Sequence, residues 1–176
     1  MNNSDIQTHQ ASYETIFQRT GLHDDARFYR WVARFVNPHR ESRVLDVACG
    51  EGGLLAAVAD FGCQAWGLDI SATALGKIRI HQPHTRVVLG NSEQLPFASE
   101  SFDYVTCLGS IENFAHPRTA LFEMRRVLKS GGILVAMMPN KFWIGDILNI
   151  LGGREEQQPF QRFERVATLS QWTRFL

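Results

Sequence analysis

The chain has 176 residues, 44% of them hydrophobic and 20% charged, which fits one globular domain with a sizeable core and argues against a second full domain. Lys plus Arg and Asp plus Glu both number 18, so no net charge favours nucleic acid or an anionic membrane as a partner. A polar N-terminus, the lack of an apolar run near the ~20 residues of a membrane span, and three cysteines without metal-ligand spacing (Cys49, Cys63 and Cys107) predict a cytoplasmic protein that binds no metal.

The first forty residues are predicted to form an N-terminal helical segment. A short helix can form over residues 13–20, and Asp24 or Asp25 can cap a second helix that Asn37 and Pro38 end. The apolar residues of this second helix recur at i, i+3, i+4, i+7 and i+8, so we expect them to form one face that packs on a sheet. These residues are Phe28, Trp31, Val32, Phe35 and Val36.

Residues 44–55 are predicted to be the ligand-binding centre of the chain. A buried strand over 44–47 is followed by a tight turn with three glycines and then by an apolar helix that Gly62 can end. Gly50 and Gly52 have no Cβ, so a ligand can approach the backbone closely and face the N-terminus of the helix. The inner face of that helix is expected to contain Leu54, Leu55, Val58 and Ala59.

The chemistry of this loop favours a cationic ligand. The dinucleotide motif G-x-G-x-x-G would need a third glycine where Leu55 stands. The loop carries Asp46 and Glu51 but no Lys or Arg, so a pyrophosphate would meet negative charge. A ligand with a sulfonium and an ammonium group, such as S-adenosylmethionine, would instead be attracted.

Strands and helices then alternate along the chain. A second strand is expected over residues 64–68 and a third over 86–89, with a helix over 72–81 between them that Pro83 ends. Asp69 closes the second strand where α/β folds of this kind hold a ribose, because a carboxylate can accept both hydroxyl protons. A helix cap is its alternative role, but Ser71 is placed to do that.

A fourth strand and a polar rim follow. The continuous, mostly apolar run over residues 102–108 is typical of a strand covered on both faces. Residues 109–116 come next, and an acceptor is expected there because ligands of open α/β sheets lie beyond the carboxyl ends of the strands. Glu112 and His116 are the candidate proton acceptors, although each could equally be a surface residue or a helix cap.

The remaining pattern completes an α/β fold. Pro117 suits the first position of a helix that Gly131 and Gly132 end, with Arg125 and Arg126 on its solvated side and a fifth strand over 133–138. Residues 141–176 are predicted as a lid-like helix, a loop and the start of another helix. The alternation predicts a parallel sheet with helices on both faces. The apolar face of the helix at Pro117 is expected to contain Ala120, Leu121, Met124, Val127 and Leu128.

These motifs together resemble the class I S-adenosylmethionine-dependent methyltransferases, in the form common among small-molecule enzymes. Residues 44–53 are similar to their glycine-rich first motif, and the resemblance continues in order through residues 68–71, 90–97, 101–105 and 127–132. It implies one domain with a Rossmann-like, doubly wound sheet. Within residues 1–176 this domain comprises the helical segment 1–40, a cofactor-binding core over 41–140 and a truncated lid-like segment over 141–176, with the sixth and seventh strands of the family absent.

The resemblance also implies which residues bind S-adenosylmethionine. The Asn91 side chain is expected to bind the adenine amine and the Ser92 backbone N–H an adenine ring nitrogen; many relatives carry Asp at position 91, but an amide oxygen can accept the same hydrogen bond. An ordinary Asn-Ser turn is the alternative. Tyr13 would contact the cofactor if the N-terminal segment folds over it, and is otherwise a packing aromatic. The expected set is Asp46, Ala48, Cys49, Gly50, Gly52, Asp69, Ile70, Asn91, Ser92, Leu108 and Tyr13.

The function implied by the resemblance is methyl transfer from S-adenosylmethionine to a small-molecule acceptor. A module that binds this cofactor or its product without turnover, an inactive fragment, and a nucleotide-dependent oxidoreductase are the alternatives. No Asn-Pro-Pro-Tyr run follows the fourth strand, which argues against the amino-methylation of nucleic acids. Residues 133–138 contain no charge or proline, so without further strands they predict an edge that promotes self-association, or a fragment of a longer protein.

Overall fold

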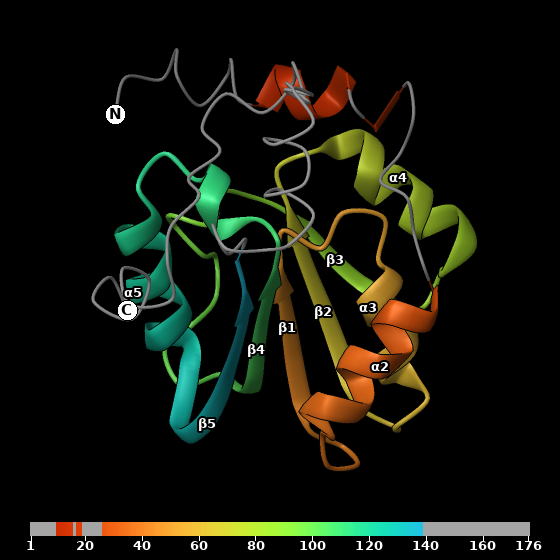
Figure 1. Ribbon diagram of the computed structural model, residues 1–176, viewed down its shortest axis with the longest axis vertical. Coiled ribbons are helices and arrows are strands. Elements are labelled where there is room, and N and C mark those ends of the chain that lie inside the picture. Colours follow the sequence, from red (N-terminus) through yellow and green to blue (C-terminus); the bar gives the residue numbers. More distant parts are fainter. Residues whose placement is uncertain (1–9, 16, 19–25, 139–176) are drawn as a thin grey trace, which may run out of the picture.

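The computed structural model describes residues 10–15, 17–18 and 26–138. Residues 10–15 and 17–18 are helical. The elements that follow are shown in Figure 1: α2 (Ala26–Val36), β1 (Arg43–Val47), α3 (Gly53–Ala59), β2 (Gln64–Asp69), α4 (Ala72–His81), β3 (Arg86–Leu89), β4 (Phe102–Leu108), the 3-10 helix η1 (Ile111–Asn113), α5 (Pro117–Val127) and β5 (Leu128–Met137). The expected cap at Asp24 or Asp25, the lid-like segment 141–176 and the expected absence of strands six and seven lie outside the described residues.

The described strands form one sheet in the order β3-β2-β1-β4-β5, and every neighbouring pair is parallel. This confirms the predicted doubly wound α/β fold. Strands β2 and β3 lie on one side of β1, and β4 and β5 lie on its other side. A ligand site is expected beyond the carboxyl ends of β1 and β4, where the strand order reverses.

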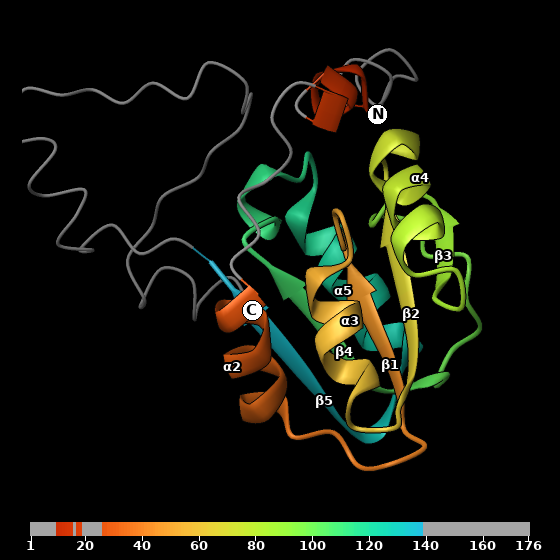
Figure 2. The same cartoon turned by 90° about the vertical axis from the view of Figure 1, so that its right-hand side faces the viewer.

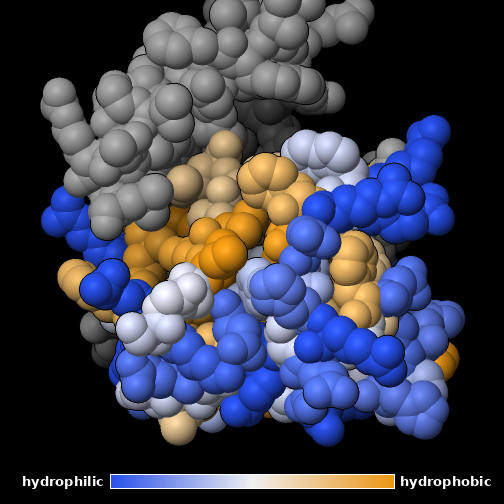
Figure 3. Space-filling view, turned by 90° about the horizontal axis from the view of Figure 1, so that it is seen from below, coloured by the Kyte–Doolittle hydropathy of each residue, from blue (hydrophilic) through white to orange (hydrophobic). Residues whose placement is uncertain are grey.

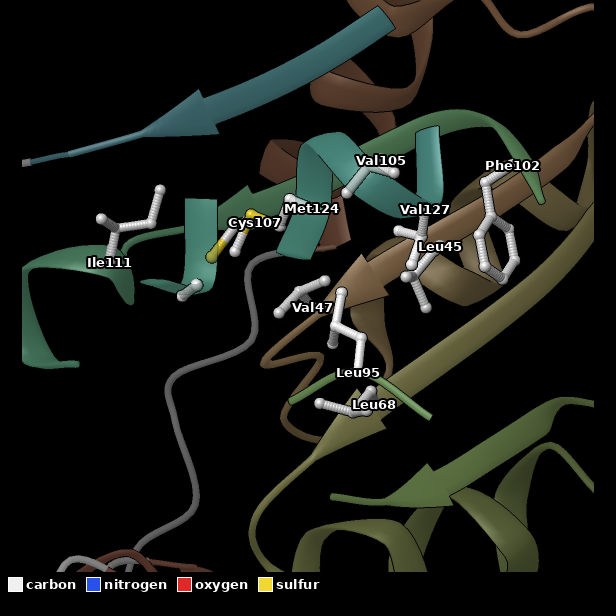
Figure 4. Packing of buried hydrophobic residues seen from close by; sticks show 11 residues of the cluster. Leu45, Val47, Leu68, Leu95, Phe102, Val105, Cys107, Ile111, Met124 and Val127 are labelled. Atoms are coloured by element: carbon white, nitrogen blue, oxygen red, sulfur yellow. The ribbon is translucent and has the colours of Figure 1, made fainter. Parts of the chain in front are cut away.

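Two apolar layers cover the sheet, and alternate residues of the central strands belong to different layers. Leu45, Val47, Val105 and Cys107 face α5, where Met124 and Val127 pack against them (Figure 4). Val44 and Tyr104 face the opposite way and contact α2 and α3. Figure 2 shows the same division, with α2, α3 and α4 on one side of the strands. Period-two alternation on strands buried on both faces explains why β4 is mostly apolar, with Asp103 and Thr106 as its polar residues.

Helix α2 differs from its sequence prediction. Val32, Ala33 and Val36 are buried, but Trp31 is 62% exposed and Phe35 69% exposed. The two rings stack on each other with centroids 6.0 Å apart. The apolar stripe of this helix is wider than the surface it packs against, so only one part of the stripe can be buried. Helical periodicity alone does not indicate which part.

Two smaller expectations are also corrected. Ala59 lies at the exposed end of α3 and does not belong to its inner face. Helix α5 ends at Val127, and β5 begins at Leu128 instead of Ile133. Phe102 pairs with Leu128 and Tyr104 with Ile133, so the chain segment with the two glycines forms an irregularity within the ladder and does not end the helix.

Arg126 is not a solvated residue of α5. Its Nε donates to Glu123 Oε1 at 2.7 Å, and its other nitrogens donate to the backbone oxygens of Phe97, at 2.8 Å, and Leu95, at 3.0 Å. Acceptors on three residues for one guanidinium fix the connection between β3 and β4 against α5. This contact holds in place the segment that follows Asn91 and Ser92.

Candidate functional site

A cavity opens at the carboxyl ends of the strands, as the strand order predicts. Counted out to its open mouth and including the solvent there, it encloses about 680 Å³ of space not occupied by atoms. Its lining comes from the N-terminal helix and from the loops after β1, β2, β3 and β4. The lining residues are Tyr13, Phe17, Ala48, Gly50, Leu68, Asp69, Ile70, Gly90, Asn91, Ser92, Glu93, Ser110, Phe114 and Ala115.

The glycine loop after β1 has the backbone conformations that its sequence predicts. Gly50 has φ 53° and Gly52 φ 81°, both in the left-handed region that favours glycine. The two glycines have different roles. Gly50 lines the cavity, whereas a Cβ on Gly52 would lie 3.0 Å from the Ile78 side chain of α4. A Cβ at this position would therefore press on the Ile78 side chain, and this contact of Gly52 with α4 was not visible in the sequence.

Asp69 is the most constrained carboxylate of the lining. It is 5% exposed, and its two oxygens accept hydrogen bonds from the backbone N–H groups of Gly50 and Ser71, both at 2.8 Å. Ser71 caps α4, because its hydroxyl accepts from the Ala74 N–H at 3.2 Å. Asp69 is therefore not the cap. Burial raises its pKa, although these backbone hydrogen bonds oppose the rise.

Asn91 and Ser92 lie in the lining at the end of β3. The Asn91 Oδ1 accepts from the Glu93 N–H at 2.9 Å, which is the ordinary turn that the sequence offered as an alternative. A carbonyl oxygen has two lone pairs, so this bond still leaves one for a ligand. The turn and the predicted adenine contact are therefore compatible.

Four of the expected cofactor residues are not in the lining: Asp46, Cys49, Gly52 and Leu108. Asp46 is buried and accepts a hydrogen bond from the Thr106 hydroxyl at 2.7 Å. Burial raises the pKa of Asp46 to about 7. Its side chain therefore belongs to the interior between β1 and β4, and contact of any of the four with a cofactor stays a prediction.

The N-terminal helix covers one side of the cavity, and two contacts hold it there. The Glu14 carboxylate accepts from the Ala72 N–H at 2.6 Å and the Thr73 N–H at 3.2 Å, at the N-terminus of α4. Lys77 donates to the Phe17 backbone oxygen at 2.8 Å and to Glu51 Oε1 at 2.6 Å. Tyr13 thereby lines the cavity, and its contact with a cofactor stays a prediction.

The two candidate proton acceptors lie in different surroundings. Glu112 is 5% exposed within η1, directly after the lining residue Ser110. The side chain of His116 is 52% exposed and outside the lining; its Nδ1 lies 3.0 Å from Glu93 Oε2. The other Glu93 oxygen accepts from the His116 backbone N–H at 2.8 Å. Glu93 thus fixes the start of α5, and neither candidate is assigned as a base by its position.

Sequence analysis missed the contributions of Glu14, Phe17, Lys77 and Glu93. Glu14 and Lys77 make contacts across 58 and 60 residues of sequence, and no local pattern indicates such pairs. Glu93 could have been considered, because it follows the third strand at the same edge of the sheet as Asp69. Among the described residues, no helix has the length and apolar character needed to cross a membrane.

Comparisons with known proteins agree with this architecture. Residues 45–136 match the family described as "Methyltransferase domain". The chain is 39% identical over 109 residues to a demethylmenaquinone methyltransferase of Renibacterium salmoninarum, which covers 62% of this chain and 46% of that protein. It is 32% identical over 151 residues to a protein of the same name from Geobacillus stearothermophilus, covering 74% of this chain and 64% of that protein.

A third relative is the ubiquinone biosynthesis O-methyltransferase of Alkalilimnicola ehrlichii, 30% identical over 156 residues, with 82% of this chain and 63% of that protein covered. The chain thus spans about half to two thirds of the length of these relatives. Among solved structures, the YcgJ protein from Bacillus subtilis superposes with TM-score 0.67 at 25% identity over 84% of this chain and 64% of that chain. The [4+2]-cyclase SpnF has TM-score 0.68 at 24% identity over 86% of this chain and 54% of its own, which shows a shared fold alone.

The parallel sheet, the glycine loop and a cavity with an acid at the end of β2 define a class I, Rossmann-like ligand-binding domain. Because the family match extends over more than half of the chain, the chain belongs to the methyltransferase-domain family of S-adenosylmethionine-dependent enzymes.

Proposed function

We propose that this protein transfers the methyl group of S-adenosylmethionine to a small-molecule acceptor. The observation that carries the proposal is Asp69, whose oxygens are oriented by two backbone N–H groups at the wall of the cavity. Among the described residues, the lining contains two carboxylates, Asp69 and Glu93, and no Lys, Arg or His. Such a lining suits a ligand with positive groups and does not suit a pyrophosphate.

The residues present fit this cofactor. Asp69 would accept the ribose hydroxyls, and Asn91 and Ser92 would bind the adenine edge. Gly50 and Ala48 leave room for close approach of the methionine portion. S-adenosylmethionine, when bound, supplies a methyl group that its sulfonium already activates, so the protein mainly needs to align the acceptor and exclude water.

The N-terminal helix would help to exclude water from the cavity. Tyr13 and Phe17 form an apolar wall of the cavity, and the Glu14 and Lys77 contacts attach that wall to α4. Hydrogen bonds from Thr73 and from backbone N–H groups keep the pKa of Glu14 below its usual value against the opposing effect of burial, so the attachment is charged at neutral pH. An attached wall positions an acceptor more precisely than an open surface would.

The names of the relatives support a small-molecule acceptor, since two are demethylmenaquinone methyltransferases and one acts in ubiquinone biosynthesis. One alternative has a specific observation in its favour. The cyclase SpnF shares the fold, so this architecture also occurs in a protein named for another reaction. A cofactor-binding module without methyl transfer therefore stays the second candidate.

Two measurements test the proposal on the 176-residue chain. Thermal unfolding is followed with S-adenosylhomocysteine and, separately, with NAD and NADP; only the former is expected to raise the melting temperature, and its stabilisation should grow with the logarithm of its concentration over Kd. Formation of S-adenosylhomocysteine from S-adenosylmethionine is then measured with a small-molecule cell extract. Stabilisation by NAD or NADP alone would contradict the proposal, and binding without turnover would favour the module.

A further inference from the structure

The charges around the cavity carry information about the acceptor, and the inference drawn from them rests on the proposed function. The residues expected to hold the cofactor lie along β1, β2 and β3: Ala48, Gly50, Asp69, Ile70, Asn91 and Ser92. The rest of the lining faces them from the N-terminal helix and from the loop after β4. Three rings dominate that second part, namely Tyr13, Phe17 and Phe114.

A buried carboxylate lies in the loop after β4, between the lining residues Ser110 and Phe114. Glu112 is 5% exposed, and its Oε1 is 4.0 Å from the position that a Cβ on Gly109 would take, at the carboxyl end of β4. Burial raises the pKa of the Tyr13 phenol, and the negative charge of Glu112 is the next cause of this rise. The same charge contributes to the raised pKa of the buried Cys107 thiol, after burial and the charge of Asp46.

The combination of rings and carboxylates selects for positive charge. Ring faces attract organic cations within about 6 Å, and a carboxylate adds a Coulomb attraction that a partly dry cavity strengthens. An anionic acceptor would face the lining carboxylates Asp69 and Glu93, and the described part of the lining has no Lys, Arg or His to neutralise it. The nearest described lysine, Lys77, is already paired with Glu51 at 2.6 Å.

We propose that the acceptor is an amine that binds as its ammonium form between the aromatic rings, with Glu112 as the residue that selects its charge. In the transfer, the ammonium first loses a proton to solvent through the open mouth of the cavity. The nitrogen lone pair then forms the N–C bond to the methyl carbon while the C–S bond breaks. Its electron pair stays on sulfur, and the products are a methylated ammonium and S-adenosylhomocysteine.

The test uses the 176-residue chain saturated with S-adenosylhomocysteine, which has no sulfonium charge. Phenethylamine, 2-phenylethanol and 3-phenylpropanoate share one shape and present a cation, a neutral group and an anion. Calorimetry is expected to show the amine binding at least about tenfold more tightly than the alcohol, with no binding of the carboxylate. Glu112→Gln should remove the preference, whereas Glu100→Gln, an exposed residue next to the amino end of β4, should leave it unchanged.

Two further readouts separate the possible failures. If S-adenosylhomocysteine itself does not bind, the proposed function fails. If it binds to wild type and Glu112→Gln alike, the variant is folded and the comparison of the three probes decides. Binding of the carboxylate, binding of none of the three probes, or an amine preference that Glu112→Gln retains would overturn the inference. A changed ratio of S-adenosylmethionine to S-adenosylhomocysteine affinity in Glu112→Gln, with the amine preference intact, would instead assign Glu112 to the cofactor.

Discussion

Replacing Asp69 by Asn should weaken the binding of S-adenosylhomocysteine by roughly 10- to 150-fold. The substitution keeps the size of the side chain and removes its charge. Asp69 offers two oxygens to the loop and to the cavity, and both already accept a backbone N–H at 2.8 Å. The asparagine retains one oxygen, so its NH₂ group must face one of the two N–H donors.

The magnitude follows from two effects on the ligand. A hydrogen bond from a ribose hydroxyl to a charged acceptor contributes about 1.5–3 kcal/mol. At about 1.4 kcal/mol per factor of ten, its loss changes Kd by roughly 10- to 150-fold. The turned NH₂ group would also displace the N–H of Gly50 or Ser71, which moves the loop that contacts the ligand. The upper part of the range is therefore expected if the loop shifts.

The matched control is Asp103→Asn. Asp103 also ties a strand end to its neighbour, since its Oδ2 accepts from the Arg43 N–H at 2.9 Å and its Oδ1 from Lys129 at 2.7 Å. It lies at the amino end of β4, however, and not at the cavity. Isothermal titration calorimetry with S-adenosylhomocysteine should show a loss for Asp69→Asn alone. Equal losses in both variants, or unchanged affinity in Asp69→Asn, would refute the ribose assignment.

Two further predictions concern stability. Burial raises the pKa of Asp46 to about 7, so its protonated form contributes fully to stability below the unfolded pKa of about 3.9, and this contribution is lost as the pH rises through 7. In urea unfolding, the free energy of unfolding of wild type minus that of Asp46→Asn should therefore decrease over that interval. A constant difference would contradict the raised pKa. Gly67→Ala should destabilise by about 1–3 kcal/mol, since its Cβ would lie 2.6 Å from Leu55 and 2.7 Å from Cys49, whereas Gly76→Ala, with open space in α4, should stabilise by about 0.5–1 kcal/mol. Equal effects of the two alanines in thermal unfolding would count against the packing argument.

The sequence predicts most of the scaffold because its element ends are well marked. The ends of β4 and α4 agree with prediction, since Ser71 caps α4 and Pro83 follows it, while Gly109 follows β4. The acid at the end of β2 and the glycine after β1 were found in the same way, since both depend on a strand followed by a turn. These features are local, and local patterns indicate them well.

The contacts that build the walls of the cavity could not be predicted in this way. Glu14 reaches the N-terminus of α4 from the N-terminal helix, and Arg126 reaches the loop after β3 from α5. Both are charged residues on helices, for which a solvated position is the usual expectation. Only the packing of the helices on the sheet brings each of them to its backbone partners, so the sequence alone indicated neither.

The edge of the sheet leads to the last prediction. Among the described strands, β5 pairs on one side only, with β4, and Ile133 and Met137 are 48% and 41% exposed. From below, Figure 3 shows hydrophobic atoms gathered in one area that hydrophilic residues border. An unpaired apolar strand favours pairing with another chain, so the 176-residue chain should elute above its monomer mass in size-exclusion chromatography with light scattering. Ile133→Lys should shift the measured mass towards that of the monomer, because a charge on an edge strand opposes pairing.

Val135 is less suitable for this test, since it packs against the α2 layer. Ile80→Lys is the control, because Ile80 is 75% exposed on α4, away from this edge, and should leave the mass unchanged. A wild-type monomer, or an equal shift in both lysine variants, would show that the edge of β5 does not drive association.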